Sequence, residues 1–380
     1  MTAGGSVSRT IERAWKREGM DGRAIRLALL PASALFSGIV RLRALAYRWQ
    51  LRRCRALPAA VVSVGNLSVG GTGKTPTALW LAESLQNRGY SVAILSRGYG
   101  GDVRRPTVVG TAPPKPGVPA SAEARVVGDE SLVLARRFSG PVVVAPRRAE
   151  AGALACGELG ADVLVLDDGF QHLSLRRDFD LVCVRPAAAG DDRVLPAGRL
   201  REPPAALGRA RAVLVTNGTP GERVHPRLEP HLARMPLYRG ELRAVNLVTP
   251  DSGEWRELPM GVLAVRKALG VAGLADPQPF YRTLHDWEAR IQDYLEFADH
   301  HVYTLEDWKQ IAYRSRDLDL VVTTEKDLVK LEQFPFAKDK LVAVRVSMHV
   351  ENGSQLVDSV VAAIERRRAE LAADRERRHP

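Results

Sequence analysis

The chain has 380 residues, of which 45% are hydrophobic and 26% are charged. This length predicts two or three domains with a buried core, and the composition excludes an intrinsically disordered chain and an integral membrane protein. The net charge is +11, which normally indicates a phosphate-rich partner or an anionic surface. The position of the charge along the chain decides between the two.

The positive charge is concentrated at the N-terminus. Residues 1–57 contain twelve Lys and Arg against three Asp and Glu, a net charge of +9, whereas the other 323 residues carry only +2. A nucleic-acid-binding enzyme more often carries its basic residues throughout the body of the fold. We therefore expect no nucleic-acid partner and interpret the excess as a property of the N-terminal segment.

An apolar run, Leu27–Val40, lies within that segment and is flanked by arginines. As a helix its 14 residues reach about 21 Å, short of the roughly 30 Å hydrocarbon core, and Pro31 and Gly38 would bend or break it. It also starts late for a signal peptide and lacks a cleavage site. We do not expect this run to span a membrane. It is either an interfacial helix with arginines on anionic headgroups or a helix packed on its own domain.

The cysteines indicate the redox environment. Cys54, Cys156 and Cys183 are widely spaced and form no CxxC motif. An odd, sparse set predicts neither a disulfide framework nor a structural zinc site, so a reducing cytosol is expected.

From Ala59 the chain alternates between buried strands and helices. After the first strand, a Gly-rich turn leads into an expected helix, Thr75–Arg88, which ends at Gly89. Residues 101–122 are rich in Pro and Gly and predict an exposed excursion. The alternation predicts an α/β fold with a doubly wound, mostly parallel sheet. The expected strands are Ala59–Val64, Ser91–Leu95, Val142–Ala145, Val163–Leu166, Leu181–Val184 and Val213–Thr216.

A second α/β series follows a polar stretch near residue 220. We expect Val262–Arg266 to open it, with helices at Gln278–Leu284 and Leu305–Arg314 and strands at Leu318–Thr323 and Leu341–Val346. The tail from Gln355 predicts a charged, solvated helix.

The strongest motif is the Gly-rich turn itself, which runs from Gly65 to Thr75 between a strand and a helix. Glycines let successive backbone N–H groups point at a phosphate, and the start of the helix adds positive potential. Lys74 would then reach the β- and γ-phosphates, and Thr75 would offer its hydroxyl to Mg²⁺. Ser68 stands where the strict P-loop pattern has Gly. The residues expected to bind the nucleotide are Gly70, Gly71, Thr72, Gly73, Lys74 and Thr75.

A P-loop requires a carboxylate near the metal. The apolar strand that starts after Asp162 ends at Asp167 and Asp168, at the carboxyl end of a strand, where α/β sheets bind their ligands. We expect at least one of the two to contact Mg²⁺ directly or through water.

Phosphoryl transfer to an alcohol also needs a group that positions the hydroxyl and accepts its proton. Candidates outside the loop are Asp129, His172, His300 and His301. Residue spacing alone leaves these four open.

Seven motifs lie in order along the chain, namely VGNLSVGGTGKTP (64–76), SRGYG (96–100), VGDE (127–130), LDDGFQH (166–172), LPAGRLREP (195–203), DHHVYT (299–304) and TTEKDLVKL (323–331). A shared P-loop alone would not produce the later motifs. Taken together, the seven resemble the tetraacyldisaccharide 4′-kinases, the lipid A 4′-kinases of Gram-negative envelope synthesis. The resemblance runs from about Pro58 to Leu331, and the N-terminal segment also fits.

The resemblance implies transfer of the γ-phosphoryl group of ATP, with Mg²⁺, to the 4′-hydroxyl of an acylated disaccharide 1-phosphate. It implies that Lys74 and Thr75 hold ATP and Mg²⁺, that Asp167 or Asp168 completes the metal site, and that Asp129 is the catalytic base with His300 as its partner. An imidazole beside a carboxylate can orient it and share the proton. The residues implied for the substrate are Arg97, Tyr99, Gln171, His172, Arg201 and Glu202.

The resemblance also sets the expected organisation. We expect a basic amphipathic membrane-associating segment at 1–57, a P-loop NTPase-like kinase domain at 58–220, a second, smaller α/β domain at 221–350 and a charged C-terminal helix at 351–380. The enzyme would work peripherally at the cytoplasmic face of the inner membrane, on an anionic surface. No obligate protein partner is expected.

The chain departs from the family pattern at four places. Ser131 and Arg199 stand where Pro is usual, Arg185 stands where Asp is typical, and 191–193 replace a glycine-bearing turn. None of these departures removes a proposed catalytic group. The alternative function from another class is a P-loop ATPase or GTPase switch that acts on a partner protein, but it leaves the motifs after residue 195 without a purpose.

Overall fold

The structure, a computed structural model, describes Trp15 and residues 19–110, 120–186, 193–218, 222–335 and 340–378. The expected turn at Asp191 and Asp192 and positions 111–119 of the Pro-rich stretch lie outside these ranges. The chain forms two compact units, each built from separate stretches of sequence. Unit 1 comprises residues 1–78, 162–241 and 349–380, and unit 2 comprises residues 79–161 and 242–348. The predicted division into consecutive ranges stays a prediction.

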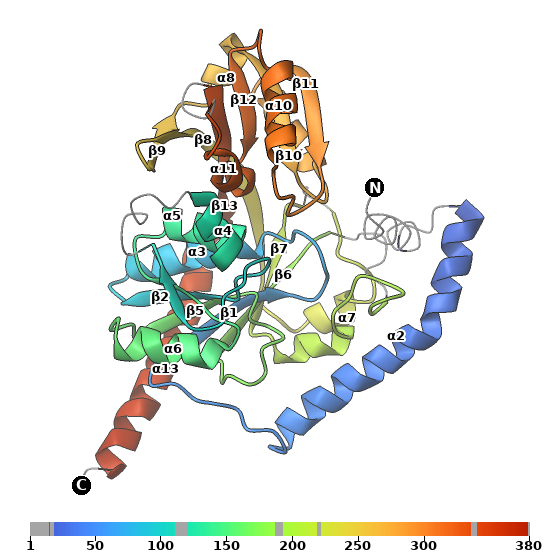
Figure 1. Ribbon diagram of the computed structural model, residues 1–380. Coiled ribbons are helices and arrows are strands. Elements are labelled where there is room, and N and C mark those ends of the chain that lie inside the picture. Colours follow the sequence, from blue (N-terminus) through green and yellow to red (C-terminus); the bar gives the residue numbers. More distant parts are fainter. Residues whose placement is uncertain are drawn as a thin grey trace. The chain divides into compact units, whose positions relative to one another are not determined.

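Unit 1 contains a parallel sheet. β1 (Ala60–Asn66) lies between β5 (Val163–Asp167) and β6 (Phe179–Val184), and β7 (Ala212–Thr216) pairs with both β6 and the first residues of β8 (Leu237–Asp251) (Figure 1). Every residue of β1, β5, β6 and β7 is buried, as expected of parallel strands that are covered on both faces. The predicted parallel α/β sheet is confirmed.

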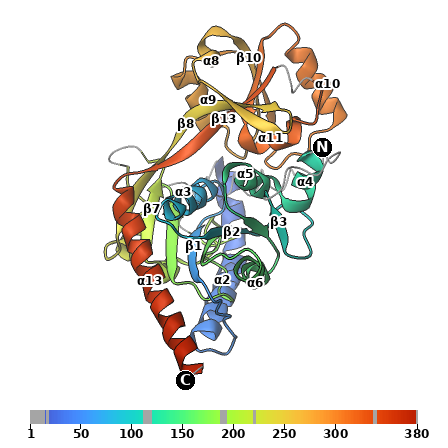
Figure 2. The same ribbon diagram turned by 90° about the vertical axis from the view of Figure 1, so that its left-hand side faces the viewer.

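The helices of unit 1 include α13 (Gly353–Arg378), which packs against β1 (Figure 2). The prediction of a charged helix is confirmed, but it is not solvated all round. Leu356, Val360 and Ile364 are fully buried, and the Arg367 guanidinium donates to the Leu57 carbonyl over 3.1 Å. The other helical segments are the start of α3 (Lys74–Gln86), η1 (Pro204–Arg209) and α7 (Glu229–Leu232).

The N-terminal helix α2 (Gly19–Arg48) is longer than the sequence predicts. Its 30 residues correspond to about 45 Å, so the prediction of a helix too short to span is wrong. Pro31 lies inside the helix, which bends without breaking (Figure 1). Within the described ranges α2 is the one helix that is long and apolar enough to cross a membrane, over Asp21–Arg48. Only 11% of the apolar window within it is buried.

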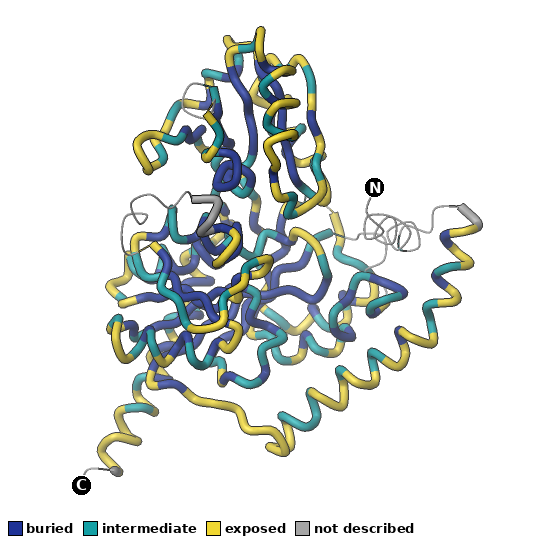
Figure 3. Tube along the Cα trace, viewed as in Figure 1, coloured by how far each residue is buried: buried dark blue, intermediate teal, exposed yellow. Residues whose placement is uncertain are grey.

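Helix α2 has two distinct faces (Figure 3). On one face Arg26 and Ser33 are buried, and Phe36 packs against an apolar cluster of unit 1. The other face exposes four large apolar side chains at helical spacing, namely Leu27, Leu35, Ile39 and Leu42.

The described residues in the first part of unit 2 include the rest of α3, followed by strands β2 to β4 and helices α4 to α6. β4 (Val142–Val144) pairs in parallel with β2 (Val92–Ser96) and antiparallel with β3 (Thr107–Val109). The stretch predicted as an exposed excursion therefore contains a strand, whose Val109 is buried, so that prediction is wrong for these residues. The helices are α4 (Ala120–Val127), α5 (Asp129–Arg137) and α6 (Arg148–Gly157).

The second part of unit 2 contains the predicted second α/β series. Four parallel strands lie in the order β11, β10, β12, β13, and β8 pairs antiparallel with β9. The residues expected to open the series form a short helix, α8, before β10. The bounds are β9 (Glu254–Leu258), α8 (Val262–Val265), β10 (Lys267–Gly273), α9 (Gln278–Asp286), β11 (Arg290–Phe297), α10 (Leu305–Arg314), β12 (Leu320–Thr324), α11 (Glu325–Leu331) and β13 (Leu341–Val350).

Packing of α11 against α4 and α5 joins the two parts of unit 2. Val329 of α11 belongs to one apolar cluster with Val127, Leu132 and Val144. This packing places the N-terminus of α5 beside one face of α11, where most of the site in unit 2 is built.

Candidate functional site

The Gly-rich loop lies between β1 and α3, as predicted, and its shape is fixed by side chains of unit 1. The Asn66 amide donates to the Ser68 carbonyl over 2.6 Å and to the Thr72 hydroxyl over 2.8 Å. The hydroxyl of Thr216, a residue of β7, donates to the Thr72 carbonyl over 2.9 Å. The loop is therefore pre-formed, which lowers the entropy cost of binding a phosphate.

Two of the three predicted metal ligands, Thr75 and Asp167, meet at the start of α3. The Thr75 hydroxyl donates to the carboxylate of Asp167, with oxygen distances of 3.2 and 3.3 Å. Asp167 is buried at the end of β5, as expected for a carboxylate at the carboxyl end of a parallel strand.

Asp168 has different neighbours from Asp167. Arg201 donates to both of its oxygens over 2.8 and 2.9 Å, and Lys74 Nζ lies 3.8 Å from Oδ1. Its backbone is in the left-handed region, with φ of 54°, a conformation that costs a non-glycine residue free energy. The two neighbouring aspartates therefore have different partners. Asp167 accepts a hydrogen bond from the Thr75 hydroxyl, whereas Asp168 forms ion pairs with Arg201 and Lys74.

Three other predicted residues belong to unit 1, and one of them, Gln171, contacts the end of β1 that leads into this loop. The Gln171 amide donates to the Asn66 carbonyl over 2.9 Å, and the His172 ring contacts the Ser174 hydroxyl at 3.1 Å. Glu202 is buried and accepts two hydrogen bonds from Arg209, each of 2.9 Å. The sequence reading missed this internal ion pair of Glu202, because the contact depends on the η1 turn.

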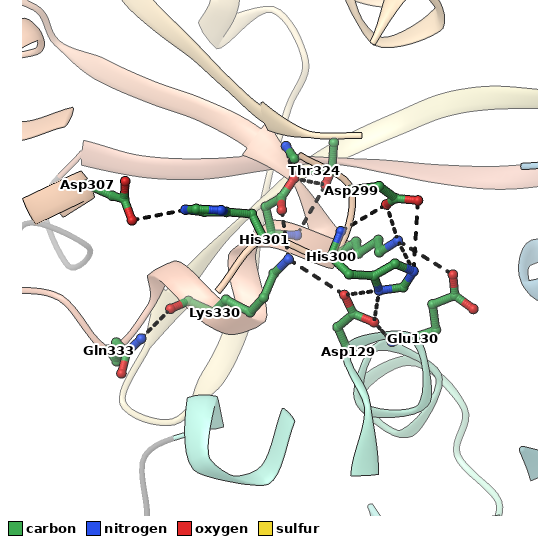
Figure 4. Close-up of polar contacts among 12 residues, drawn as sticks. Asp129, Glu130, Asp299, His300, His301, Asp307, Thr324, Lys330 and Gln333 are labelled. Carbon is green, nitrogen blue, oxygen red and sulfur yellow. Dashed lines mark hydrogen bonds and ion pairs between the residues drawn. The ribbon is translucent and has the colours of Figure 1, made fainter. Parts of the chain in front are cut away.

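In unit 2 the structure brings Asp129 and His300 together (Figure 4). Nδ1 of His300 lies 3.2 and 3.1 Å from the two carboxylate oxygens of Asp129. Asp129 is buried at the first turn of α5, and His300 follows β11 with a left-handed φ of 57°. Of the four candidates for the proton acceptor, these two are in contact.

Two lysines that the sequence reading did not single out complete this cluster. Lys326 Nζ lies 3.1 Å from His300 Nε2 and 2.8 Å from Asp299. Lys330 Nζ lies 3.6 Å from Asp129 Oδ2. Since the two lysines are four residues apart on α11, they point to one side of that helix, a spacing within the TTEKDLVKL motif that could have revealed them.

These contacts shift the pKa values of the pair in opposite directions. Burial would raise the pKa of Asp129, but the hydrogen bond with His300 and the charges of Lys326, His300 and Lys330 outweigh it and lower that pKa. The hydrogen bond with Asp129 raises the pKa of His300, against burial and the charge of Lys326. Asp129 is therefore an ionised acceptor beside a basic imidazole.

The contacts also assign the tautomer of the neutral His300 ring. Lys326 can only donate, so Nε2 of His300 accepts from it, and the ring proton lies on Nδ1 facing Asp129. Protonation of Nε2 would place two donors against each other. Lys326 therefore limits how far the pKa of His300 can rise.

The remaining predicted residues of unit 2 have distinct surroundings. Tyr99 is 70% exposed, and its ring centroid lies 5.4 Å from that of His300. Arg97 is exposed just after β2. His301, a candidate base, contacts Asp307 at 3.0 Å, and Asp307 belongs to the capping box of α10. His301 therefore has a structural partner.

A histidine titration tests the coupling in this cluster. Asp129→Asn removes the charge that favours the imidazolium, so the pKa of His300 should fall. Lys326→Met removes an opposing charge, so the pKa should rise. The midpoints can be followed by NMR on histidine-labelled protein, with the signal assigned by His300→Gln and the exposed His285 as internal reference. An unchanged His300 midpoint in both variants would contradict the coupling.

Comparison with known proteins identifies the family. The family described as tetraacyldisaccharide-1-P 4′-kinase matches residues 25–365. The chain is 37% identical to the tetraacyldisaccharide 4′-kinase of Pelobacter propionicus, over 90% of this chain and 94% of that protein. It is 38% identical to the tetraacyldisaccharide 4′-kinase of Anaeromyxobacter dehalogenans, over 93% of this chain and 94% of that protein. The apo form of LpxK from Aquifex aeolicus, crystallised in complex with ATP, has a TM-score of 0.72 and 29% identity, over 90% of this chain and 99% of that one. The chain therefore belongs to the tetraacyldisaccharide 4′-kinase family.

Proposed function

We propose that this chain transfers the γ-phosphoryl group of ATP to the 4′-hydroxyl of an acylated disaccharide 1-phosphate, a precursor of lipid A. The observation that carries the proposal is the contact of Asp129 with His300 in a chain that also holds a pre-formed phosphate loop. A nucleotide switch needs the phosphate loop, but it does not need a buried carboxylate paired with an imidazole to accept the proton of an alcohol.

The phosphate loop supplies the nucleotide half of the reaction. The backbone N–H groups of Gly70–Gly73 and the start of α3 would face the phosphates, and Lys74 would add a positive charge. The protein's contribution is to position the transferred group and to neutralise the charge that spreads over its oxygens.

The donor set of Thr75 and Asp167 fits a magnesium ion. Mg²⁺ prefers oxygen ligands, and it commonly takes one or two carboxylates together with substrate phosphates and water. Among the described residues there is no cluster of three or more His, Cys, Asp and Glu that could hold a metal alone, so the nucleotide would supply further ligands. When bound, Mg²⁺ would offset the negative charge of the phosphates.

Asp129 and His300 supply the acceptor half of the reaction. We propose that Asp129 accepts the proton of the sugar hydroxyl, while the Nδ1–H group of His300 donates to the carboxylate and holds it in place. Because the pKa of Asp129 is lowered, the carboxylate stays ionised at neutral pH and ready to accept. Lys326 and Lys330 would hold the ionised form while substrate approaches.

A product assay tests this proposal. The protein incubated with ATP, Mg²⁺ and a tetraacyldisaccharide 1-phosphate should yield a 1,4′-bisphosphorylated lipid detected by mass spectrometry. In Asp129→Asn the kcat should fall by about 10²- to 10⁴-fold, the usual contribution of a positioned base, while nucleotide affinity is kept. The exposed Asp286 of the same unit provides the matched control, Asp286→Asn. ATP hydrolysis at a rate that does not depend on the lipid would favour the switch function. Near-normal turnover in Asp129→Asn would exclude Asp129 as the base.

We further propose that α2 attaches the enzyme peripherally to the anionic cytoplasmic face of the inner membrane. The Ser33 hydroxyl donates to the Val194 carbonyl over 2.6 Å, and Arg43 donates to the Gln171 carbonyl over 2.9 Å. Since a spanning helix would lose these contacts, the helix lies on its unit with Leu27, Leu35, Ile39 and Leu42 free to enter the acyl boundary. The net charge of +9 in residues 1–57 attracts anionic headgroups.

Vesicle binding tests the role of the exposed face. Leu35→Glu combined with Ile39→Glu should weaken partitioning onto phosphatidylglycerol-containing vesicles by at least about 100-fold, because each side chain contributes about 1.5–3 kcal/mol on burial. The control makes the same change in charge at two exposed apolar positions of unit 2, Val265→Glu and Tyr313→Glu. Equal partitioning of the two double variants would exclude α2 as the membrane-binding element.

A further inference from the structure

A segment of unit 1 pairs with the phosphate loop through one isolated antiparallel bridge, between Ser68 and Leu200, and places two arginines there. The Val69 N–H donates to the Arg199 carbonyl over 2.9 Å, and the Arg201 N–H donates to the Leu67 carbonyl over 2.6 Å. Side chains alternate along an extended chain, and Leu200 is buried in an apolar cluster. Arg199 and Arg201 therefore share the opposite face of this segment.

The guanidinium of Arg199 lies against Gly70 of the phosphate loop. A Cβ added at Gly70 would lie 2.7 Å from Arg199 Nη2 and 3.8 Å from Arg185 Nη2. Gly70 has a φ of +105°, so only glycine both adopts this backbone and leaves room for the guanidinium. Two positive groups thus converge on one point of the loop, and an anion bound there would offset their repulsion.

Arg199 differs from the arginines around it in its partners. Arg201 is paired with Asp168, and Arg209 is paired with Glu202. In the described part of the chain Arg199 makes no ion pair, and its buried Nε has no hydrogen-bond acceptor. A buried donor without an acceptor costs free energy. The Nε–H group of Arg199 can therefore still donate to a ligand that supplies an acceptor.

The Arg199 side chain is nevertheless held in place. Its guanidinium carbon lies 5.7 Å from the centroid of the Trp15 ring, and the Trp15 indole donates to the Pro196 carbonyl over 2.9 Å. The ring therefore supports the guanidinium through a cation–π contact without using its N–H donors.

We propose that Arg199, with Arg185 beside it, binds the terminal phosphates of the nucleotide and is a further positioning residue for phosphoryl transfer. This inference rests on the proposed function. An arginine beside the phosphates stabilises the charge of phosphoryl transfer in other P-loop proteins. Here the arginine comes from the same chain. The position of the guanidinium on Gly70, inside the nucleotide loop, favours the nucleotide over the phosphate of the acceptor lipid as the ligand.

Equilibrium binding of AMPPNP in the presence of Mg²⁺ and without lipid tests the inference. Arg199→Ala and Arg199→Gln should each weaken AMPPNP binding by about 10- to 100-fold, the usual effect of losing a charged hydrogen bond, and leave AMP binding unchanged. Arg199→Lys should recover part of the affinity, because it keeps the charge but not the planar fork. Arg211→Ala, at an exposed arginine of the same unit, should bind AMPPNP normally. The KM for ATP should rise in the two neutral variants while the KM for the lipid acceptor does not.

Three outcomes would overturn the inference. AMPPNP affinity within about twofold of normal in Arg199→Gln, with an unchanged thermal midpoint, would show that Arg199 does not contact the phosphates. A rise in the KM for the lipid alone would assign the guanidinium to the phosphate of the acceptor. If the unaltered chain failed to bind AMPPNP, the proposed function would fail as well, which separates that result from the first two.

Discussion

A buried carboxylate keeps its charge only where donors and cations surround it, and this constraint governs unit 2. Asp129 is buried at the start of α5 and is ringed by His300, Lys326 and Lys330. The lysines reach it because α11 packs on α4 and α5. His300 reaches it from the turn after β11, with its backbone in the left-handed region. The second α/β series thus places two cations and an imidazole around one carboxylate.

In unit 1 the charged side chains around the phosphate loop are also arranged in pairs. In the proposed function its cations would face the phosphates of ATP, and one carboxylate would remain for the metal. Asp168 engages Lys74 and Arg201, whereas Asp167 bonds to the Thr75 hydroxyl. Asp168, like His300, is a non-glycine residue with a positive φ. Strained backbone at both positions is consistent with selection for the site geometry over local stability.

Much of this could be predicted from the sequence, because its strongest signals are local. The loop around Lys74 and the strand that ends at Asp167 depend on short-range patterns, and the comparisons agree with the family that the motifs indicated. The length of α2 could not be predicted, since the packing of residues such as Phe36 sustains the helix past Pro31. Lys326 and Lys330 were missed because helical lysines usually face water, whereas the packing of α11 leaves Lys330 buried and Lys326 partly buried here. Arg199 appeared only as a departure from the family pattern until its pairing with Val69 placed it at the loop.

The central claim is that Asp129 and His300 act as one catalytic unit. A double-mutant cycle on the kcat for phosphoryl transfer measures this directly, with Asp129→Asn, His300→Gln and the combined variant. Residues that act as a unit give strongly non-additive losses. We expect the combined variant to be no slower than Asp129→Asn alone, within about twofold. A combined loss equal to the product of the two single losses would contradict it.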